Sequence, residues 1–336
     1  MNKISILFLA IGLIFLSFIK VTLTETVPIG MAVEFNDHAA CAYISQEKGW
    51  FKEEGLILST YESYETGMAL ASALARGDIQ VAYLCLVPAL NVYANAQVPL
   101  KIVMGTHKYG YGLVVNPKRV KTIQDLEKTD NRIGCVREGG AADILLHKII
   151  DKFNLNQDRV LENIQRMNPS KQLLAFTLGQ LDAVILPEHW ATMAEAVGGS
   201  QMLLTSQDIW KEMLGSVLVV KEELIINHPE IVESLVKISQ RATDWINQYP
   251  QEAAEIMAQQ LQITGKSFLP IEIANGNTPT RISSEILLKS MNRIKYTTEL
   301  EVSIIQETID YITTLGYIRN SFKAEKILDF SFITEK

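Results

Sequence analysis

An arginine and two glycines stand between a predicted strand and a predicted helix in the second third of the chain. Residues 132–136 read RIGCV, a buried strand, and residues 137–140 read REGG before the helix AADILLHKII. Amides in the first turn of a helix lack an intrahelical acceptor, and the helix dipole favours a negative group there. Gly139, Gly140 and Ala141 would supply such amides, and Arg137 could add a charge-assisted contact. The stretch therefore predicts one of two walls of an anion-binding site, although a plain tight turn would use the same glycines.

A nucleotide enzyme would need residues that this stretch lacks. A P-loop carries Lys and then Ser or Thr after its glycines, and GGAAD at 139–143 carries neither. We also find no G-x-G-x-x-G and no G-x-S-x-G pattern. Cys135 and His147 could suggest a thiol nucleophile, but Cys135 lies within a predicted strand and His147 fits an amphipathic helix. We therefore expect a binding protein with no catalytic residues and no cofactor.

A unit of alternating strands and helices occurs twice. Residues 74–90 and 176–191 each end a helix at a glycine, run through a short strand and reach a proline before another helix. The upstream segments repeat as well, which predicts β-α-β-α-β in each half, including a helix over 39–55 and a strand at 160–167. Such alternation is typical of parallel sheets with helices on both faces. The alternative is a single doubly wound sheet in which the similarity of the two segments is accidental.

Two β-branched runs, residues 111–117 and 215–223, lie between the halves and predict crossing strands. Lobe one would then comprise residues 27–113 and 218–336, and lobe two residues 114–217. Helices are predicted in 229–261, where they would pack back on lobe one. Ligands of parallel sheets bind beyond the carboxyl ends of the strands, so both sets of loops would face one cleft. The expected fold is an α/β clamshell of two parallel-sheet lobes joined by two crossing strands.

The first residues differ from the rest. MNK precedes an apolar run at residues 4–19, which is short for a membrane span of about 20 residues. A basic start and a short apolar run are typical of a secretory signal. We expect residues 1–26 to be a signal segment, either cleaved or kept as an anchor, and the remainder to be periplasmic or otherwise extracytoplasmic.

Charge and cysteine content exclude other classes. A net charge of −7 and the lack of a basic run argue against a nucleic-acid partner. Cys41, Cys85 and Cys135 are too few and too far apart for a disulfide scaffold or a zinc site. We expect three buried thiols, with one disulfide as the alternative.

Several motifs resemble one family of transport proteins. Residues 43–56, YISQEKGWFKEEGL, resemble a segment of the substrate-binding proteins of ABC importers for nitrate, sulfonates and taurine, which have thiamine-precursor binders as close relatives. Gly49, Phe51, Glu54 and Gly55 match the pattern, and Ser45 departs from it. Further resemblances follow in order at ALARGDIQVAYL, TIQDLE, RIGCVREGGAADILLHK and HPEIVESLVKISQRATDWINQYPQEAAEIMA, and together they cover about residues 28 to 260.

The resemblance implies a type II periplasmic-binding-protein clamshell, a small-molecule ligand and the membrane permease of an ABC transporter as partner. We expect a monomer. Docking on a receptor, as in a sensor, is an alternative. Residues 263–336 extend past the resemblance, and the sequence suggests no function for them. In the family, the loops beyond the strands carry the ligand contacts, which here correspond to Asp37, His38, Glu65, Thr66, Gly67, Cys85, Arg137, Gly139, Gly140, Ala141, Glu188, His189 and Trp190.

Acidic residues in these loops leave the ligand open. Asp37, Glu65, Glu138 and Glu188 would repel a bare anion such as nitrate, unless they face solvent or cap helices. The ligand could instead be zwitterionic like taurine, with its ammonium against Glu65 or Glu188. It could also be a thiamine-type pyrimidine stacked on aromatic residues, namely Phe35, Tyr64 and Trp190. A metal site from His38, Glu65, Glu188 and His189 is not expected, because no pair of ligands has helical i, i+4 spacing.

Overall fold

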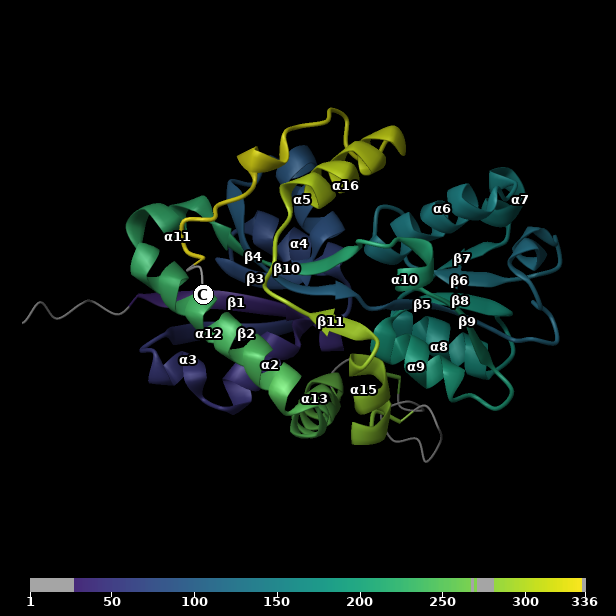
Figure 1. Ribbon diagram of the computed structural model, residues 1–336, viewed down its shortest axis with the longest axis horizontal. Helices are drawn as coiled ribbons and strands as arrows, with labels where there is room; N and C mark the ends of the chain where they lie inside the picture. The colour runs from purple at the N-terminus through teal and green to yellow at the C-terminus, as the bar shows by residue number, and fades with distance from the viewer. Residues whose placement is uncertain (1–26, 267–268, 271–280, 334–336) are drawn as a thin grey trace, which may run out of the picture.

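The computed structural model of the chain describes residues 27–266, 269–270 and 281–333 (Figure 1). The expected signal segment, residues 1–26, lies outside these ranges. Two β-sheets with their helices form two lobes, which lie side by side along the long axis of the molecule (Figure 1). Within the described ranges, no helix combines the length and the apolar character that crossing a bilayer requires.

The first lobe is built on a six-stranded sheet of order β11-β4-β10-β3-β1-β2. Its strands are β1 (Pro28–Glu34), β2 (Ile57–Tyr64), β3 (Val81–Cys85), β4 (Leu100–Tyr109), β10 (Leu214–Lys221) and β11 (Ile294–Tyr296). Its helices are η1 (Asp37–Ala39), α2 (Ala40–Glu47), α3 (Trp50–Glu53), α4 (Gly67–Arg76), α5 (Leu86–Ala96), α11 (Glu222–Asn227), α12 (Pro229–Gln248) and α13 (Pro250–Gly265).

The second lobe is built on a five-stranded sheet of order β7-β6-β8-β5-β9. Its strands are β5 (Tyr111–Val115), β6 (Ile133–Cys135), β7 (Ile164–Arg166), β8 (Ala183–Pro187) and β9 (Gln201–Thr205). Its helices are η2 (Ile123–Glu127), α6 (Ala141–Phe153), α7 (Gln157–Glu162), α8 (Pro169–Thr177), α9 (Glu188–Glu195) and α10 (Ser206–Ile209).

The two expected crossing strands turn out to lie inside the sheets. β5 pairs antiparallel with β8 and β9, and β10 pairs antiparallel with β3 and β4, so both sheets are mixed rather than parallel. The chain crosses between the lobes at Gly110 and again between α10 and β10. Gly110 has a φ of +89°, which glycine adopts without strain, and this lets β4 turn directly into β5. The division at residues 113 and 218 stays a prediction.

Local signals in the sequence set most helix ends. Thr66 precedes α4, and its side chain accepts a hydrogen bond from the Ala69 amide at 3.3 Å. The helix expected over 39–55 is divided into α2 and α3 at Gly49, which has a φ of +72°. The strand expected at 160–167 is also partly wrong, because its first residues finish α7 and only β7 is extended.

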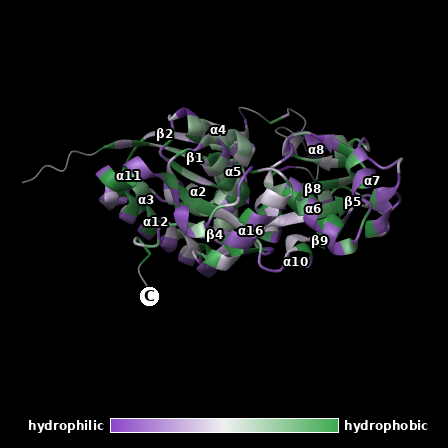
Figure 2. Cartoon of the chain, turned by 90° about the horizontal axis from the view of Figure 1, so that it is seen from above, coloured by the Kyte–Doolittle hydropathy of each residue, from purple (hydrophilic) through white to green (hydrophobic). Residues whose placement is uncertain are grey.

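The apolar residues gather on the strands and on the inner faces of the helices of both lobes (Figure 2). Trp50 and Phe51 are buried in the first lobe, and the Arg241 guanidinium lies 4.3 Å from the centre of a Trp50 ring. Helices α12 and α13 pack against α2, which confirms that the chain returns to the first lobe. Cys41, Cys85 and Cys135 are buried free thiols, so the disulfide alternative is not realised.

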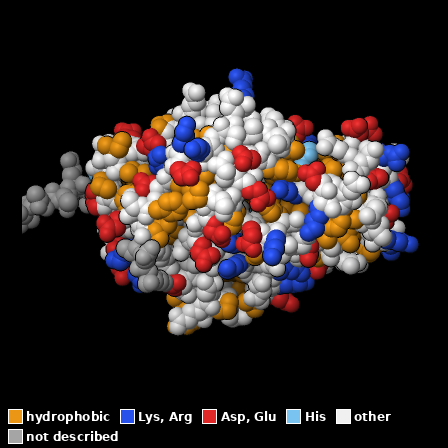
Figure 3. Space-filling view, turned by 45° about the horizontal axis from the view of Figure 1, so that its top comes forward, with side chains coloured by type: hydrophobic (Ala, Val, Ile, Leu, Met, Phe, Trp, Pro, Cys, Tyr) orange, Lys and Arg blue, Asp and Glu red, His pale blue; other side chains and the backbone are white. Residues whose placement is uncertain are grey.

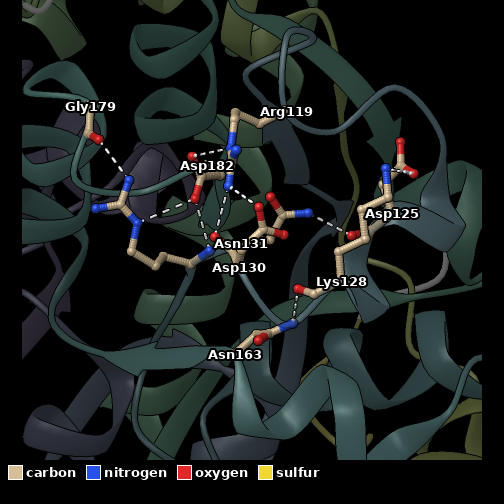
Figure 4. A network of polar contacts seen from close by, with 9 residues as sticks. Arg119, Asp125, Lys128, Asp130, Asn131, Asn163, Gly179 and Asp182 are labelled. Atoms are coloured by element: carbon tan, nitrogen blue, oxygen red, sulfur yellow. Dashed lines mark hydrogen bonds and ion pairs between the residues drawn. The ribbon is translucent and has the colours of Figure 1, made fainter.

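A polar network fixes the loops before β8 in the second lobe (Figure 4). The Asp182 carboxylate accepts hydrogen bonds from the backbone amide of Arg132 at 2.9 Å and from its Nε at 3.3 Å. The Arg119 Nε lies 3.5 Å from the same carboxylate. Asp182 precedes β8 and Pro187 ends it, so the network sits at the opposite end of the strand from the loops that face the first lobe.

The C-terminal region packs on both lobes. It contains α15 (Ser284–Met291), β11, α16 (Val302–Thr314) and η3 (Ala324–Lys326). Helix α15 contacts α13 in the first lobe and α9 in the second. Helix α16 contacts α5, and its Tyr311 hydroxyl donates to Asp151 of α6 at 2.6 Å. The region therefore spans the junction of the lobes on two sides (Figure 1).

Candidate functional site

A pocket lies between the two lobes at the ends of their strands. Its first-lobe wall is formed by the residues that follow β1, β2 and β3, and its second-lobe wall by the start of β5 and the loops after β6, β7 and β8. Its volume is about 40 Å³. This is room for a few water molecules, so the lobes are closed in this structure. A larger ligand would enter only when the lobes separate.

Two helix starts from opposite lobes line the pocket. Thr66, Gly67 and Met68 come from the start of α4, and Ala141 and Ala142 come from the start of α6. Amides in the first turn have no acceptor within the helix, and both helix dipoles direct positive potential toward the pocket. One anionic group could therefore contact both lobes at once.

The two glycines before α6 behave differently from the sequence-based expectation. The Gly139 amide donates to Asp143 Oδ2 at 3.0 Å, and the Gly139 carbonyl accepts from Asn91 Nδ2 at 3.0 Å. Gly139 borders a separate cavity of about 270 Å³ and does not line the pocket. The Gly140 amide donates to the Arg137 carbonyl at 3.2 Å. The amides of Gly139 and Gly140, which we expected to be free, are therefore engaged. The third expected residue, Ala141, lines the pocket together with Ala142.

Arg137 lines the pocket and is exposed. No hydrogen bond or ion pair within the described ranges involves its side chain, whereas neighbouring Arg166 is bound to the Val136 carbonyl at 2.7 Å and to Asp143 at 2.5 Å. The guanidinium of Arg137 is thus available to a ligand, and its role in binding stays a prediction.

Glu65 reaches across the pocket and holds the second lobe. Its carboxylate accepts from Asn168 Nδ2 at 3.0 Å, from the Ser170 amide at 3.1 Å and from the Ser170 hydroxyl at 2.5 Å. These donors lie at the start of α8, where a carboxylate is favoured by the helix dipole. Glu65 is therefore a clasp between the lobes, with its charge already compensated.

We expect Glu65→Ala to favour the open form by about tenfold, because hydrogen bonds to a charged group are removed only from the closed form. Small-angle X-ray scattering of the ligand-free protein should show a larger radius of gyration than for wild type. Glu62→Ala is the matched control, since the Glu62 carboxylate forms no hydrogen bond with the second lobe among the described residues and accepts one from Tyr64 on its own strand. An unchanged radius for Glu65→Ala would show that the clasp does not govern closure.

Asp37, Glu188, His189 and Trp190 are buried beside the pocket but do not line it. Asp37 Oδ1 lies 3.4 Å from His189 Nδ1, and the Ser290 hydroxyl also contacts Asp37. Burial alone would raise the pKa of Asp37, but the contact with His189 lowers it to about 2. These residues tie the first lobe, the second lobe and α15 together.

Glu188 is similarly enclosed. Burial raises its pKa to about 7, although the Arg293 guanidinium at 3.2 Å opposes this shift. Trp190 packs on Phe35 with ring centres 5.9 Å apart and on His189 at 4.7 Å. The sequence-based expectation that Glu188 and Trp190 face the ligand is not met by this arrangement, because their helix turns them into the junction of the lobes.

Several pocket residues escaped the sequence analysis, and Glu34 is the one that bears a charge. Glu34 ends β1, is 2% exposed and lines the pocket together with Cys85, which was expected there. Its Oε1 accepts from the Cys85 amide at 2.7 Å. Asn36 and Tyr111 also line the pocket. An acidic residue at the end of an otherwise apolar, buried strand was the signal that could have identified Glu34.

The comparisons with known proteins concern the family and the fold of the chain. Residues 24–262 match a family model described as the NMT1-like family. A Brucella abortus protein named as a binding protein is 27% identical over 84% of this chain and 85% of its own length. The taurine-binding periplasmic protein of Escherichia coli is 23% identical over 62% of this chain and 64% of its own length. The alkanesulfonate-binding protein of Xanthomonas axonopodis pv. citri, solved with MOPS bound, matches with a TM-score of 0.73 at 16% identity, over 91% of this chain and 99% of that chain.

Proposed function

Because this chain belongs to the NMT1-like family, we propose that it is the extracytoplasmic substrate-binding protein of an ABC importer and captures a small sulfonate-type ligand between its lobes. The resemblance to sulfonate and taurine binders is confirmed by the comparisons, and so is the periplasmic-binding-protein fold. These relatives are binding proteins rather than enzymes. The periplasmic relative supports an extracytoplasmic location for this chain.

The observation that carries the proposal is the pair of helix starts that face one pocket from opposite lobes. A sulfonate has three acceptor oxygens, so it can accept from the first amides of α4 and of α6 together. Arg137 lines the same pocket and supplies a full positive charge. A ligand held in this way binds the closed form better than the open form, and it therefore shifts the lobes toward closure.

The surrounding carboxylates do not oppose an anion as strongly as the sequence suggested. Glu65 is held by the start of α8, and Asp37 and Glu188 are held by His189 and Arg293. The side chain of Glu138 is 74% exposed, and its nearest cation is Arg166 at 3.9 Å. Glu34 lines the pocket, is buried, and has no ion-pair partner among the described residues. The ammonium of a zwitterion such as taurine could provide the matching charge.

The other ligand classes have weaker support. A stacked pyrimidine needs aromatic walls, and none of the expected Phe35, Tyr64 and Trp190 lines the pocket, where Tyr111 is the aromatic residue present. On one face of the molecule, charged side chains of both signs are interspersed, as Figure 3 shows. That surface offers no extended basic patch for nucleic acid. We propose that the closed form, as a monomer, docks on a membrane permease, whereas a sensor of the same shape would dock on a receptor.

A thermal-shift panel tests the function. Taurine, ethanesulfonate, nitrate, glycine and an aminopyrimidine are each added to the protein, because a ligand bound only by the folded state raises Tm. A rise with one or both sulfonates supports the proposal. A rise with the aminopyrimidine alone, or turnover of any compound without a shift, contradicts it.

We expect Arg137→Ala to weaken binding of the sulfonate identified by that panel at least about tenfold, since a charge-assisted contact is lost. Isothermal titration calorimetry measures the change. Arg319→Ala is the control, because Arg319 is exposed and lies outside the pocket. If both variants bind the sulfonate with equal affinity, Arg137 does not contact the ligand.

A further inference from the structure

The Glu34 carboxylate is buried without a cation. Besides the Cys85 amide, it accepts hydrogen bonds at Oε2 from Asn36 Nδ2 at 3.0 Å and from the Cys85 thiol at 3.1 Å. None of the ion pairs between described residues includes Glu34. Burying a charge is costly unless an opposite charge compensates it. The structure therefore leaves room for a positive group next to Glu34.

His38 lies next to Glu34 and Cys85, and the backbone orients its ring. Its Nε2 lies 2.6 Å from the Gly110 carbonyl oxygen, which can only accept. Nε2 therefore carries the proton, and Nδ1 keeps its lone pair. A histidine oriented by a backbone carbonyl in this way is typical of metal ligands.

The lone pair of His38 is directed toward the same place as the side chains of Glu34 and Cys85. His38 Nδ1 lies 3.9 Å from Cys85 Sγ, and one ligand atom from each of the three residues lies within 4.8 Å of the others. In a tetrahedral zinc site, bonds of 2.0 to 2.3 Å place neighbouring ligand atoms roughly 3.3 to 3.8 Å apart. The three side chains thus need movements of less than about 1 Å to coordinate one ion.

We propose that Glu34, His38 and Cys85 bind a thiophilic divalent cation such as zinc at the base of the interlobe pocket. A divalent cation with one carboxylate, one thiolate and one neutral imidazole forms a site with no net charge, which suits a buried position. Tyr111, whose hydroxyl lies 2.8 Å from Cys85 Sγ, borders the same pocket. Three protein ligands leave a fourth position for water or a ligand atom.

The proposed metal site differs from the set of possible metal ligands that was considered, and not expected to bind a metal, on the basis of the sequence. Only His38 is common to both, because Glu65 holds α8 and Glu188 and His189 belong to the junction under α15. A thiol must lose its proton to coordinate a metal ion, so zinc affinity should increase with pH.

The first test measures zinc alone, with no organic ligand. The full chain is stripped with EDTA and titrated with zinc against a competing chelator, and bound metal is counted by mass spectrometry. We expect one zinc per chain. Cys85→Ala and His38→Gln should each weaken it at least about 100-fold, because even the loss of an outer-shell partner can cost this much. Equal zinc affinity in wild type and both variants would overturn the proposal.

Cys135→Ala is the matched control, because Cys135 is also a buried free thiol and lies in β6, outside the cluster. Cobalt provides a direct readout. Wild type and Cys135→Ala should show thiolate-to-cobalt charge-transfer absorption, and Cys85→Ala should lack it. If Cys85→Ala does not fold, loss of the band in Glu34→Gln supports the site. Absence of the band from wild type contradicts it.

The proposal concerns the same pocket as the sulfonate site but does not depend on it. The thermal-shift panel run in EDTA reports on organic ligands alone, and the zinc titration reports on the metal alone. If taurine binds and zinc does not, the taurine ammonium supplies the charge that faces Glu34, and only the metal site is defeated. Zinc binding without any sulfonate shift would defeat only the proposed ligand class.

Discussion

Gly67→Ala is expected to reduce affinity for the sulfonate by up to about 100-fold, because overpacking of a rigid site costs about 1 to 3 kcal/mol. A Cβ at this position would lie 2.2 Å from Glu34 Oε1 and 2.8 Å from Pro88 Cγ. Glu34 cannot easily retreat, since its Oε1 is bound to the Cys85 amide at 2.7 Å. The carboxylate would instead be displaced into a pocket of about 40 Å³.

Calorimetric titration with the sulfonate found in the thermal-shift panel measures this effect. Gly198→Ala is the matched control, because an added Cβ there meets no atom within 4 Å. Circular dichroism should show that α4 persists in Gly67→Ala, since alanine is a better helix former than glycine. Wild-type affinity in a folded Gly67→Ala protein would show that neither the start of α4 nor Glu34 borders the bound ligand.

Glu188→Gln is expected to stabilise the protein at pH 8 by about 3 kcal/mol and to leave its stability at pH 4.5 nearly unchanged. Burial raises the pKa of Glu188 from 4.5 to about 7 in the folded protein. Between these values the unfolded chain loses the proton first, so wild-type stability decreases as pH rises through this window. The loss is complete above the folded pKa. Glutamine cannot ionise, so the variant avoids it.

Urea unfolding at pH 4.5, 6 and 8 measures the difference. Glu195→Gln is the control of opposite sign, because the Arg293 and Lys289 contacts lower the pKa of Glu195 even though burial opposes this. Its ionised form stabilises the fold at higher pH, so Glu195→Gln should destabilise the protein at pH 8. A Glu188→Gln variant less stable than wild type at pH 8 would show that the Arg293 contact outweighs burial.

Some elements of the fold could be predicted because their causes lie within a few residues. The proline starts of α12 and α13 and the end of α4 at Gly77 were predicted where the structure has them. The strand expected at 160–167 was placed only in part, since β7 has three residues and its position depends on pairing with β6. The direction of β5 and β10 within the sheets also depends on partners distant in sequence.

The predicted site residues also fall into two groups, those that line the pocket and those that do not. Thr66, Gly67, Arg137 and Ala141 were found from loop and helix-start patterns, and all four line the pocket. Asp37, Glu188 and His189 carry the same type of signal, yet they face the junction of the lobes. Their neighbour α15 starts at Ser284, in a region for which the sequence suggested no function.

The sequence by itself determined two α/β units, their helix starts and the loops at the ends of their strands. These features depend on backbone preferences, caps and apolar patterns that act over a few residues. Only the tertiary structure decided which carboxylates face the pocket. Glu65 meets Ser170, and Asp37 meets Ser290, across 105 and 253 residues of chain. The fate of a buried charge is set by the partners that folding brings to it, and no local pattern encodes those partners.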